Sequence, residues 1–389
     1  MTNTELPPST GFEGRATLID ALRGLAALLV ACHHIERYAP LNDAARPCLP
    51  TPLVVLFEHG WCGVQVFFVI SGFVIAYSLR KIRVTPASLG NFALRRSIRL
   101  DPPYWTTIVV VLALHYLMQL HLAWKSPLDE PDPFEGPLTW RYIGLHLVYL
   151  QGIFGYENLS VGFWTLCIEV QFYLLYACGL GTAQSFRSPA ARTPADAAPW
   201  ALLTVFGPLA ALSLFEWNRS AGGAPVYDNE MWIIRYFCMF FLGVVTWWTL
   251  DRRVPQVVFW ICAVAFSVRI AQQVHLEGWQ HNLTIGLSVA LATALLIYTA
   301  GRLGRLGTCG NGRVLQYLGR ISYSLYLIHF PVSHIVKWIG AKLCGESPPA
   351  IVAVGWLMLS LICSVLAAHV MYRCVEAPSV RLATRLKHG

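Results

Sequence analysis

Charged residues are scarce in this sequence. Asp, Glu, Lys and Arg make up 13% of the 389 residues, whereas apolar residues make up 56% and the mean hydropathy is +0.51. About a quarter of the residues of an ordinary soluble domain are charged. The composition therefore excludes a typical soluble globular protein, and we expect most of the chain to be surrounded by lipid.

Several other signals are missing. Residues 1–15 contain no basic stretch followed by a short apolar core and a cleavage site, so we expect no removable signal peptide. The eleven cysteines form no Cys-x-x-Cys motif and no Cys/His spacing typical of a metal site, so we predict no metal and no bound cofactor. No internal repeat is visible, which disfavours a secondary transporter.

Ten apolar runs recur along the chain, each close to the roughly 20 residues that a membrane-spanning helix needs. Helices are expected because the bilayer core cannot satisfy open strand edges. The runs are 17–35, 60–80, 103–124, 162–182, 199–217, 231–250, 255–271, 283–301, 321–341 and 349–372. We predict an all-α integral membrane domain over 17–380, preceded by a tail at 1–16 and followed by a basic tail at 381–389.

Basic residues predict the orientation of these helices. The formal net charge is +8, and Lys and Arg gather at 80–99, at 302–320 and at 373–387. Because such clusters mark the cytoplasmic side, both termini are expected in the cytoplasm, with an even number of spans. The eleventh apolar stretch, 137–154, is then interfacial or re-entrant, and the acidic loop before it lies outside. The positive net charge is thus explained by membrane orientation, and we predict no nucleic-acid partner. The composition favours a bacterial inner membrane.

The first apolar run carries a cation and an imidazole on one helix face. Arg23 and His34 are eleven residues apart, which places them about 20° apart around a helix and about 16 Å apart along it. Ionisable groups at membrane depth are costly and often functional. Histidine can accept a proton near neutral pH. The alternative is that both side chains reach headgroups and have structural roles.

Two further runs carry polar groups at depth. Glu169 lies about a third of the way into its run from the outer side, and Arg95 and Arg99 precede the Pro-Pro start of the third run. Tyr326 and His329 share one helix face near the start of the ninth run. Helix-to-helix hydrogen bonding or cytoplasmic anchoring would explain each of these positions without a ligand.

Six segments together resemble acyltransferase family 3, a family of membrane O-acyltransferases. The resemblance covers about residues 17–380 and includes the spacing from Arg23 to His34. The other segments are GVQVFFVISGF at 63–73, RRSIRLDPPYW at 95–105, WTLCIEVQFYLL at 164–175, LGRISYSLYLIHFPV at 318–332 and YRCVEAP at 372–378. Val170 and the Asp101-Pro102 step depart from the family pattern.

The resemblance implies a cytoplasmic acyl-CoA donor, with acetyl as the commonest acyl group, and a hydroxyl acceptor on a saccharide or glycosylated molecule. It implies that His34 and Glu169 are catalytic. Substrate or donor contacts are expected from a second group of residues, namely Arg23, Arg95, Arg99, Ser71, Tyr326 and His329. The alternatives are a transporter or flippase for a lipid-linked glycan, in which buried ionisable groups relay protons, and a catalytically silent membrane scaffold.

Overall fold

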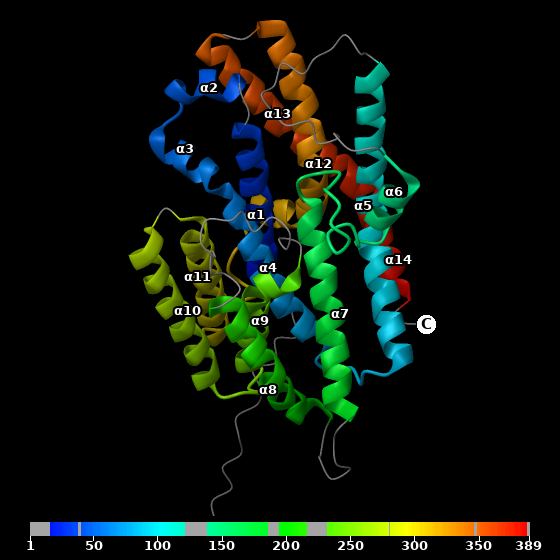
Figure 1. The fold of residues 1–389 in the computed structure, drawn as a ribbon, viewed down its shortest axis with the longest axis vertical. Coiled ribbons are helices and arrows are strands. Elements are labelled where there is room, and N and C mark those ends of the chain that lie inside the picture. Colours follow the sequence, from blue (N-terminus) through cyan, green and yellow to red (C-terminus); the bar gives the residue numbers. More distant parts are fainter. Residues whose placement is uncertain are drawn as a thin grey trace, which may run out of the picture. The chain divides into compact units, whose positions relative to one another are not determined.

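The structure is a computed structural model that describes residues 16–37, 40–120, 138–185, 194–215, 232–279, 281–345 and 348–386. Every regular element among these residues is a helix (Figure 1), which confirms the predicted all-helical class for this part of the chain. The helices form two compact units, each assembled from separate stretches of sequence. The first unit contains 1–22, 65–88 and 171–316, and the second contains 23–64, 89–170 and 317–389.

The first unit is built around one nearly fully buried helix. Its elements are most of α4 (Gly63–Leu79), the C-terminal part of α7 (Phe163–Ser185), α8 (Pro194–Phe215), α9 (Ile233–Leu250), α10 (Gln256–Glu277) and α11 (Asn282–Arg302). The central helix, α9, packs against α8, α10 and α11. At Gly72 of α4 an added Cβ would overlap the backbone of Phe240, so α4 and α9 approach at backbone distance, as small residues allow in membrane helices.

The second unit contains the remaining helices. These are most of α1 (Thr17–Glu36), α2 (Leu41–Ala45), α3 (Thr51–Glu58), α5 (Pro86–Leu120), α6 (Trp140–Leu147), α12 (Arg313–Cys344), α13 (Ala350–Met371) and α14 (Ala377–Arg385). A π-helical turn, Tyr372–Glu376, joins α13 to α14. The short helix α2, which the sequence did not predict, packs Leu41 and Ala45 against Ala353 and Leu357 of α13.

Seven helices among the described residues are long and apolar enough to cross a membrane. They are Thr17–Glu36, Gly60–Leu79, Phe163–Ser185, Ile233–Leu250, Gln256–Glu277, Asn282–Arg302 and Ala350–Arg385. The described parts of the other three predicted runs, 103–124, 199–217 and 321–341, lie in α5, α8 and α12. The structure thus accounts for seven spans by length and composition, and the total of ten stays a prediction.

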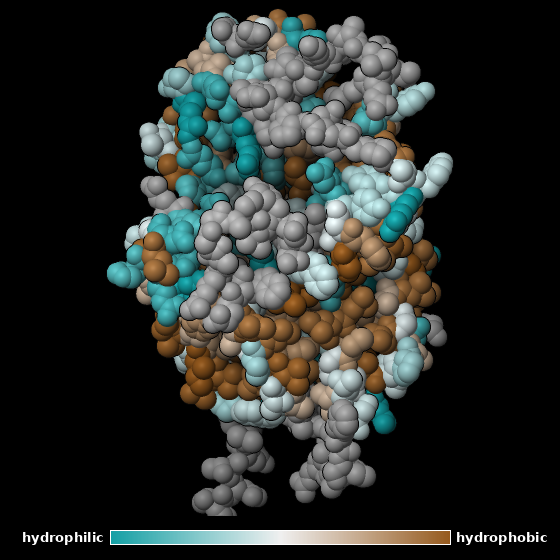
Figure 2. All heavy atoms as spheres, in the orientation of Figure 1, coloured by the Kyte–Doolittle hydropathy of each residue, from teal (hydrophilic) through white to brown (hydrophobic). Residues whose placement is uncertain are grey.

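Exposed apolar side chains support a lipid environment. On α10, Val257, Ile261, Val264 and Val268 are each between 45% and 65% exposed. Their spacing of four, three and four residues places them on one helix face. Figure 2 shows broad areas of apolar side chains on the molecular surface. Exposed apolar patches of this kind mark contact with a membrane or with another protein, and the length of the helices favours the membrane.

The stretch 137–154 contains only one short helix within its described residues. That helix, α6, has eight residues and is about 12 Å long, whereas a bilayer core is about 30 Å thick. Buried His146 donates from Nδ1 to the Tyr142 carbonyl and accepts at Nε2 from the Leu159 backbone N–H. Burial lowers the pKa of His146, which matches this neutral form. A helix of this length does not span, and its interfacial or re-entrant placement stays a prediction.

Some predicted features lie outside the described residues. These are the tail at 1–15, the acidic loop within 121–137 and the last three residues of the basic tail, 387–389. The described residues of the C-terminal segment form α14, in which Arg381 and Arg385 are exposed while Ser379 and Ala383 are buried. This helix therefore has one polar face and one buried face.

Candidate active site

A close helix crossing positions the first candidate residues. In the second unit, α1 and α12 approach at Gly24, where an added Cβ would lie 2.5 Å from the backbone nitrogen of Gly319. Only a residue without a side chain fits such an approach. The crossing brings the later part of α1, which carries His34, against the middle of α12, which carries His329.

His34 and His329 form a hydrogen-bonded pair. The Nε2 atom of His329 lies 3.1 Å from Nδ1 of His34, although the residues are 295 positions apart in the chain. The Nδ1 atom of His34 also lies 2.9 Å from the Val30 carbonyl oxygen, and Nδ1 of His329 lies 3.0 Å from the Leu325 carbonyl oxygen. His329 is fully buried and His34 is partly exposed.

The two backbone carbonyls select the tautomers of the pair. A carbonyl oxygen only accepts, so Nδ1 of His329 carries a proton toward Leu325, and Nε2 of a neutral His329 is then an acceptor. Nδ1 of His34 therefore carries the proton that it shares between Val30 and His329. As a consequence, Nε2 of neutral His34 holds a lone pair and can accept a proton. The arrangement is that of a base oriented by a second group.

A buried lysine accompanies the pair. Lys337 is 1% exposed, and its Nζ donates to the His34 carbonyl oxygen at 3.3 Å. Lys337 follows His329 by eight residues on α12, which places the two about 80° apart around the helix and about 12 Å apart along it. From α13, the Ser364 hydroxyl donates to the His329 carbonyl oxygen at 3.3 Å. Sequence reasoning missed Lys337, and the available signal was a lysine inside the predicted apolar run 321–341.

A second group of residues in the same unit contains several arginines. Nη2 of Arg96 on α5 lies 3.9 Å from Oε1 of Glu169 on α7. The guanidinium of Arg99 interacts electrostatically with Arg23, Arg96, Glu169 and Glu376. The structure thus brings together predicted residues from α1, α5 and α7. The group also includes Arg96, the neighbour of Arg95. Arg95 was predicted as a donor contact and is half-buried.

A carboxylate from the π-helical turn completes this charged cluster. Glu376 is 7% exposed and accepts hydrogen bonds from the backbone N–H and the hydroxyl of Ser324, at 3.2 and 2.5 Å. The neighbouring Tyr323 donates its hydroxyl to the Leu100 carbonyl at 2.8 Å, one residue after Arg99. π-Helical turns are frequent at functional sites. The sequence motif at 372–378 contained Glu376, but no role had been assigned to it.

Tyr326 links α12 to the start of α7. Its hydroxyl lies 2.7 Å from the Thr165 hydroxyl, and its ring centroid lies 6.2 Å from that of His329. The ring packs over Gly162, where an added Cβ would lie 3.0 Å from it. Tyr326 is therefore adjacent to the histidine pair, as its spacing on the helix predicts.

Asp101, which departs from the sequence pattern of the family, has local hydrogen-bond partners. Asp101 is buried at the Pro-Pro step of α5 and accepts hydrogen bonds from the Ser97 and Tyr149 hydroxyls, the latter at 2.9 Å. Tyr149 has a φ of +61°, which is uncommon for a residue with a side chain. Asp101 therefore ties α5 to the turn after α6.

Two further residues, the predicted contact Ser71 and His33, are not members of these groups. Ser71 is on α4 in the first unit, which is described by itself. His33, the neighbour of His34, hydrogen-bonds through Nδ1 to the Phe57 carbonyl at 2.9 Å and so links α1 to the end of α3. His33 thus has a structural partner, and of the two adjacent histidines only His34 meets His329.

The chain is similar to known acyltransferases over nearly its whole length. A family model described as an acyltransferase domain matches residues 17–369. The acyltransferase MdmB of Streptomyces mycarofaciens is 26% identical over 387 residues, which cover 95% of this chain and 93% of that protein. The putative membrane-bound transacylase BcsY of Komagataeibacter xylinus is 28% identical over 325 residues, covering 76% and 75% of the two chains.

A third relative is longer than this chain. The putative peptidoglycan O-acetyltransferase YrhL of Bacillus subtilis is 25% identical over 382 residues, which cover 92% of this chain and 54% of that protein. No solved structure matches the chain.

Proposed function

The chain belongs to the acyltransferase family whose domain model spans residues 17–369, and from that premise we propose that it moves an acyl group from acyl-CoA to a saccharide hydroxyl. The observation that carries this proposal is the histidine pair, in which backbone carbonyls and His329 leave Nε2 of His34 unprotonated. A base held in one tautomer suits proton abstraction from a hydroxyl group.

The reaction step uses His34 first as a base and then as an acid. Nε2 of His34 takes the proton of the acceptor hydroxyl while the oxygen attacks the thioester carbonyl carbon. The new C–O bond forms, the C–S bond breaks, and the departing thiolate of coenzyme A takes the proton from Nε2. His329 stabilises the transient imidazolium because its Nε2 accepts from Nδ1–H of His34. The products are the acylated saccharide and free coenzyme A.

The arginine cluster serves the donor in this proposal. Coenzyme A carries phosphates, and planar guanidinium groups hold phosphate oxygens through paired hydrogen bonds. Arg23, Arg95 and Arg99 would hold the donor at its phosphate end, and its long arm would extend along α1 toward His34. Glu169 contacts Arg96, which supports a role for Glu169 beside the arginines that would hold the donor. Its predicted catalytic role remains to be tested.

Lys337 and Tyr326 extend the site around the histidines. The ammonium group of Lys337 lies beside His34, where a cation stabilises the negative charge that develops on the thioester oxygen during attack. Tyr326 would line the path of the acyl group, because its ring is adjacent to His329 and its hydroxyl is hydrogen-bonded to Thr165. We include Ser71 of α4 as a further candidate for that path.

The names of the relatives support the proposed acceptor and acyl group. Among these, YrhL is named a putative peptidoglycan O-acetyltransferase, which supports a saccharide acceptor and an acetyl group. The predicted cytoplasmic clusters of Lys and Arg support a donor on the cytoplasmic side of a bacterial inner membrane.

Mass spectrometry of surface glycans and small glycosides tests the proposal. Cells expressing wild type, His34→Ala or no copy would be compared at matched amounts of protein in the membrane. We expect a fixed acyl mass on a saccharide only with wild type, because the variant lacks the base. Unchanged acylation together with altered export of an unmodified glycan would overturn the proposal and favour the transporter alternative.

A further inference from the structure

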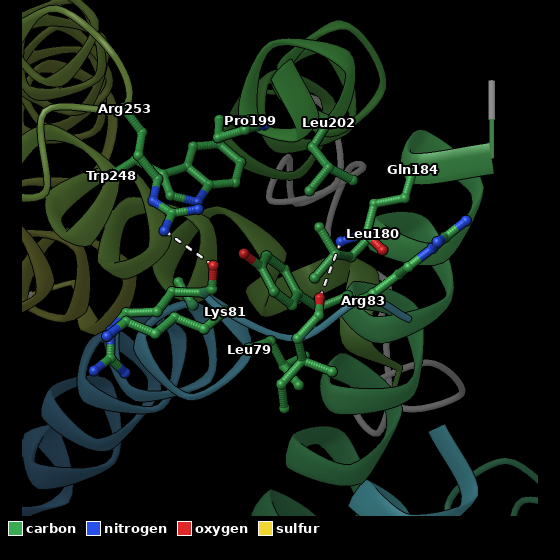
Figure 3. Close-up of a pocket in the computed structure, with 13 residues that line it drawn as sticks. Leu79, Lys81, Arg83, Leu180, Gln184, Pro199, Leu202, Trp248 and Arg253 are labelled. Atoms are coloured by element: carbon green, nitrogen blue, oxygen red, sulfur yellow. Dashed lines mark hydrogen bonds between the residues drawn. The ribbon is translucent and has the colours of Figure 1, made fainter. Parts of the chain in front are cut away.

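A pocket in the first unit is lined by none of the residues used in the proposed reaction. It encloses about 110 Å³ between the ends of α4, α7 and α9 and the start of α8. Figure 3 shows Arg253 and Trp248 on one side of this pocket, and Arg83 and Gln184 on the other. All of its described lining residues belong to the first unit.

The loop that borders the pocket is fixed by side chains from two other elements. Gln184 of α7 accepts from the Val84 backbone N–H at 2.7 Å and donates to the Ile82 carbonyl at 3.1 Å. Arg253, after α9, donates from Nη2 to the Arg80 carbonyl at 3.0 Å. A loop held at several points presents its side chains in a preformed arrangement, which lowers the entropic cost of binding.

The rim of the pocket is strongly cationic. Among its 13 described lining residues, Arg80, Lys81, Arg83 and Arg253 are basic and none is acidic. Asp251 pairs with Arg253 through Nε at 2.6 Å, which offsets one of the four charges. Lys81 and Arg83 are exposed, so both are available to a ligand that approaches from outside.

The wall of the pocket is apolar and aromatic. Leu79, Leu180 and Leu202 line it together with Tyr176 and Trp248. A cationic rim beside an apolar wall matches a molecule with a phosphate group joined to a hydrocarbon portion. We propose that this pocket binds the phosphate headgroup of an anionic phospholipid, with part of the lipid against the apolar wall.

The predicted orientation of the chain favours lipid as the source of the phosphate. Residues 80–99 form a basic cluster expected on the cytoplasmic side, where anionic lipids gather. Basic pockets between membrane helices on that side bind anionic lipid headgroups. Acyl-CoA is a second cytoplasmic source of the same phosphate chemistry, so the test must separate the two.

Native mass spectrometry of the purified full chain tests this site. Wild type and the double variant Lys81→Gln/Arg83→Gln would be titrated with phosphatidylglycerol, which is anionic, and with phosphatidylcholine, which has no net charge. A matched control is Arg302→Gln/Arg305→Gln, which removes two exposed charges at the end of α11. We expect phosphatidylglycerol affinity to fall on the order of tenfold in the first variant only, because each basic contact contributes to headgroup attraction.

The outcomes test lipid binding and also distinguish a phospholipid from acyl-CoA as the ligand of the pocket. Selective weakening of phosphatidylglycerol, with no displacement by coenzyme A, supports the proposal. Equal lipid affinity in wild type and Lys81→Gln/Arg83→Gln would overturn it, as would equal retention of the two lipids by wild type. Displacement of phosphatidylglycerol by coenzyme A would also overturn it and assign the pocket to the donor. Lipid binding is read without turnover, so this result is independent of the proposed acyl transfer.

Discussion

At the scale of single residues, the proposed chemistry depends on which nitrogen of His34 carries a proton. Val30 and His329 both meet Nδ1 of His34, and the Leu325 carbonyl fixes His329 in the matching tautomer. A histidine whose second nitrogen is held in this way is oriented as well as deprotonated at the reacting atom. In the proposed reaction His329 is therefore a positioning residue, which acts on the substrate only through His34.

Substitution of His329 tests this positioning role. His329→Leu removes one of the two acceptors for Nδ1–H of His34 and leaves the Val30 carbonyl, and a hydrogen bond to a charged group contributes about 1.5–3 kcal/mol. We expect kcat to fall about 10–100-fold with little change in KM for acyl-CoA. His329→Gln keeps a side-chain acceptor and should restore part of the rate. Equal rates in Leu, Gln and wild-type proteins would show that His329 only fills space.

Arg99 provides a test of the donor end. Arg99→Gln removes a guanidinium from the cluster with Arg23 and Arg96, and we expect KM for acyl-CoA to rise about 10–100-fold because a charge-assisted bond to phosphate is lost. The control is Arg381→Gln, which removes the same charge from an exposed position on α14. A rise in KM for the acceptor, with KM for acyl-CoA unchanged, would place Arg99 at the wrong substrate.

At the scale of helices, the site depends on the crossing of α1 with α12. The backbone contact at Gly24 and Gly319 sets the distance between the two helices, and the histidine pair forms farther along the same two elements. Small residues at membrane helix interfaces allow such approaches. A change in helix spacing is therefore expected to alter the geometry of the histidines without touching either ring.

Gly24→Ala tests the crossing. Its methyl group would lie 2.5 Å from the Gly319 nitrogen, and overpacking of this kind costs about 1–3 kcal/mol. We expect a lower midpoint of thermal unfolding in detergent and a lower acyl-transfer rate. Gly90→Ala in α5 is the control, because an added Cβ there meets nothing within 4 Å and alanine favours helix by about 1 kcal/mol. If both variants behave alike, the crossing is not tightly packed.

The sequence predicted the members of the site better than their pairings. Helical periodicity was sufficient to place Arg23 and His34 on one face, and Tyr326 and His329 on another, because these relationships are local. The His34 to His329 bond joins residues 295 positions apart, and no local rule specifies which helices meet. The ion pair of Arg96 with Glu169 and the role of Asp101 were missed for the same reason.

At the scale of the whole molecule, hydropathy and helix length describe a multi-pass membrane protein. Among the residues that the structure describes, seven helices are long and apolar enough to cross a bilayer, and exposed apolar residues on α10 fit contact with lipid. The described part of the run at 103–124 and the run at 321–341 lie in longer helices, α5 and α12, that also carry Arg95, Arg99, His329 and Lys337. Helices that carry functional polar groups are less apolar on average, so composition alone separates them poorly from other helices.

Labelling of single cysteines tests the predicted orientation. Cys48 is exposed before α3 and is predicted outside, whereas Cys309 is half-buried in the basic stretch after α11 and is predicted inside. In variants that keep one cysteine each, a membrane-impermeant maleimide should label Cys48 in intact cells and Cys309 only after permeabilisation. Labelling of both residues from the same side would contradict the assigned orientation.

Transfer of a labelled acyl group tests the central claim most directly. Acetyl-CoA carrying ¹³C in the acetyl group would be added to the cytoplasmic face of membrane vesicles with saccharide acceptors, and products would be analysed by mass spectrometry. We predict a ¹³C-acetyl ester on a saccharide with wild type and a yield lower by about 10²–10⁴-fold with His34→Ala, the range contributed by a general base. Equal yields from the two proteins would contradict the role of His34, and saccharide movement without a labelled ester would contradict acyl transfer itself.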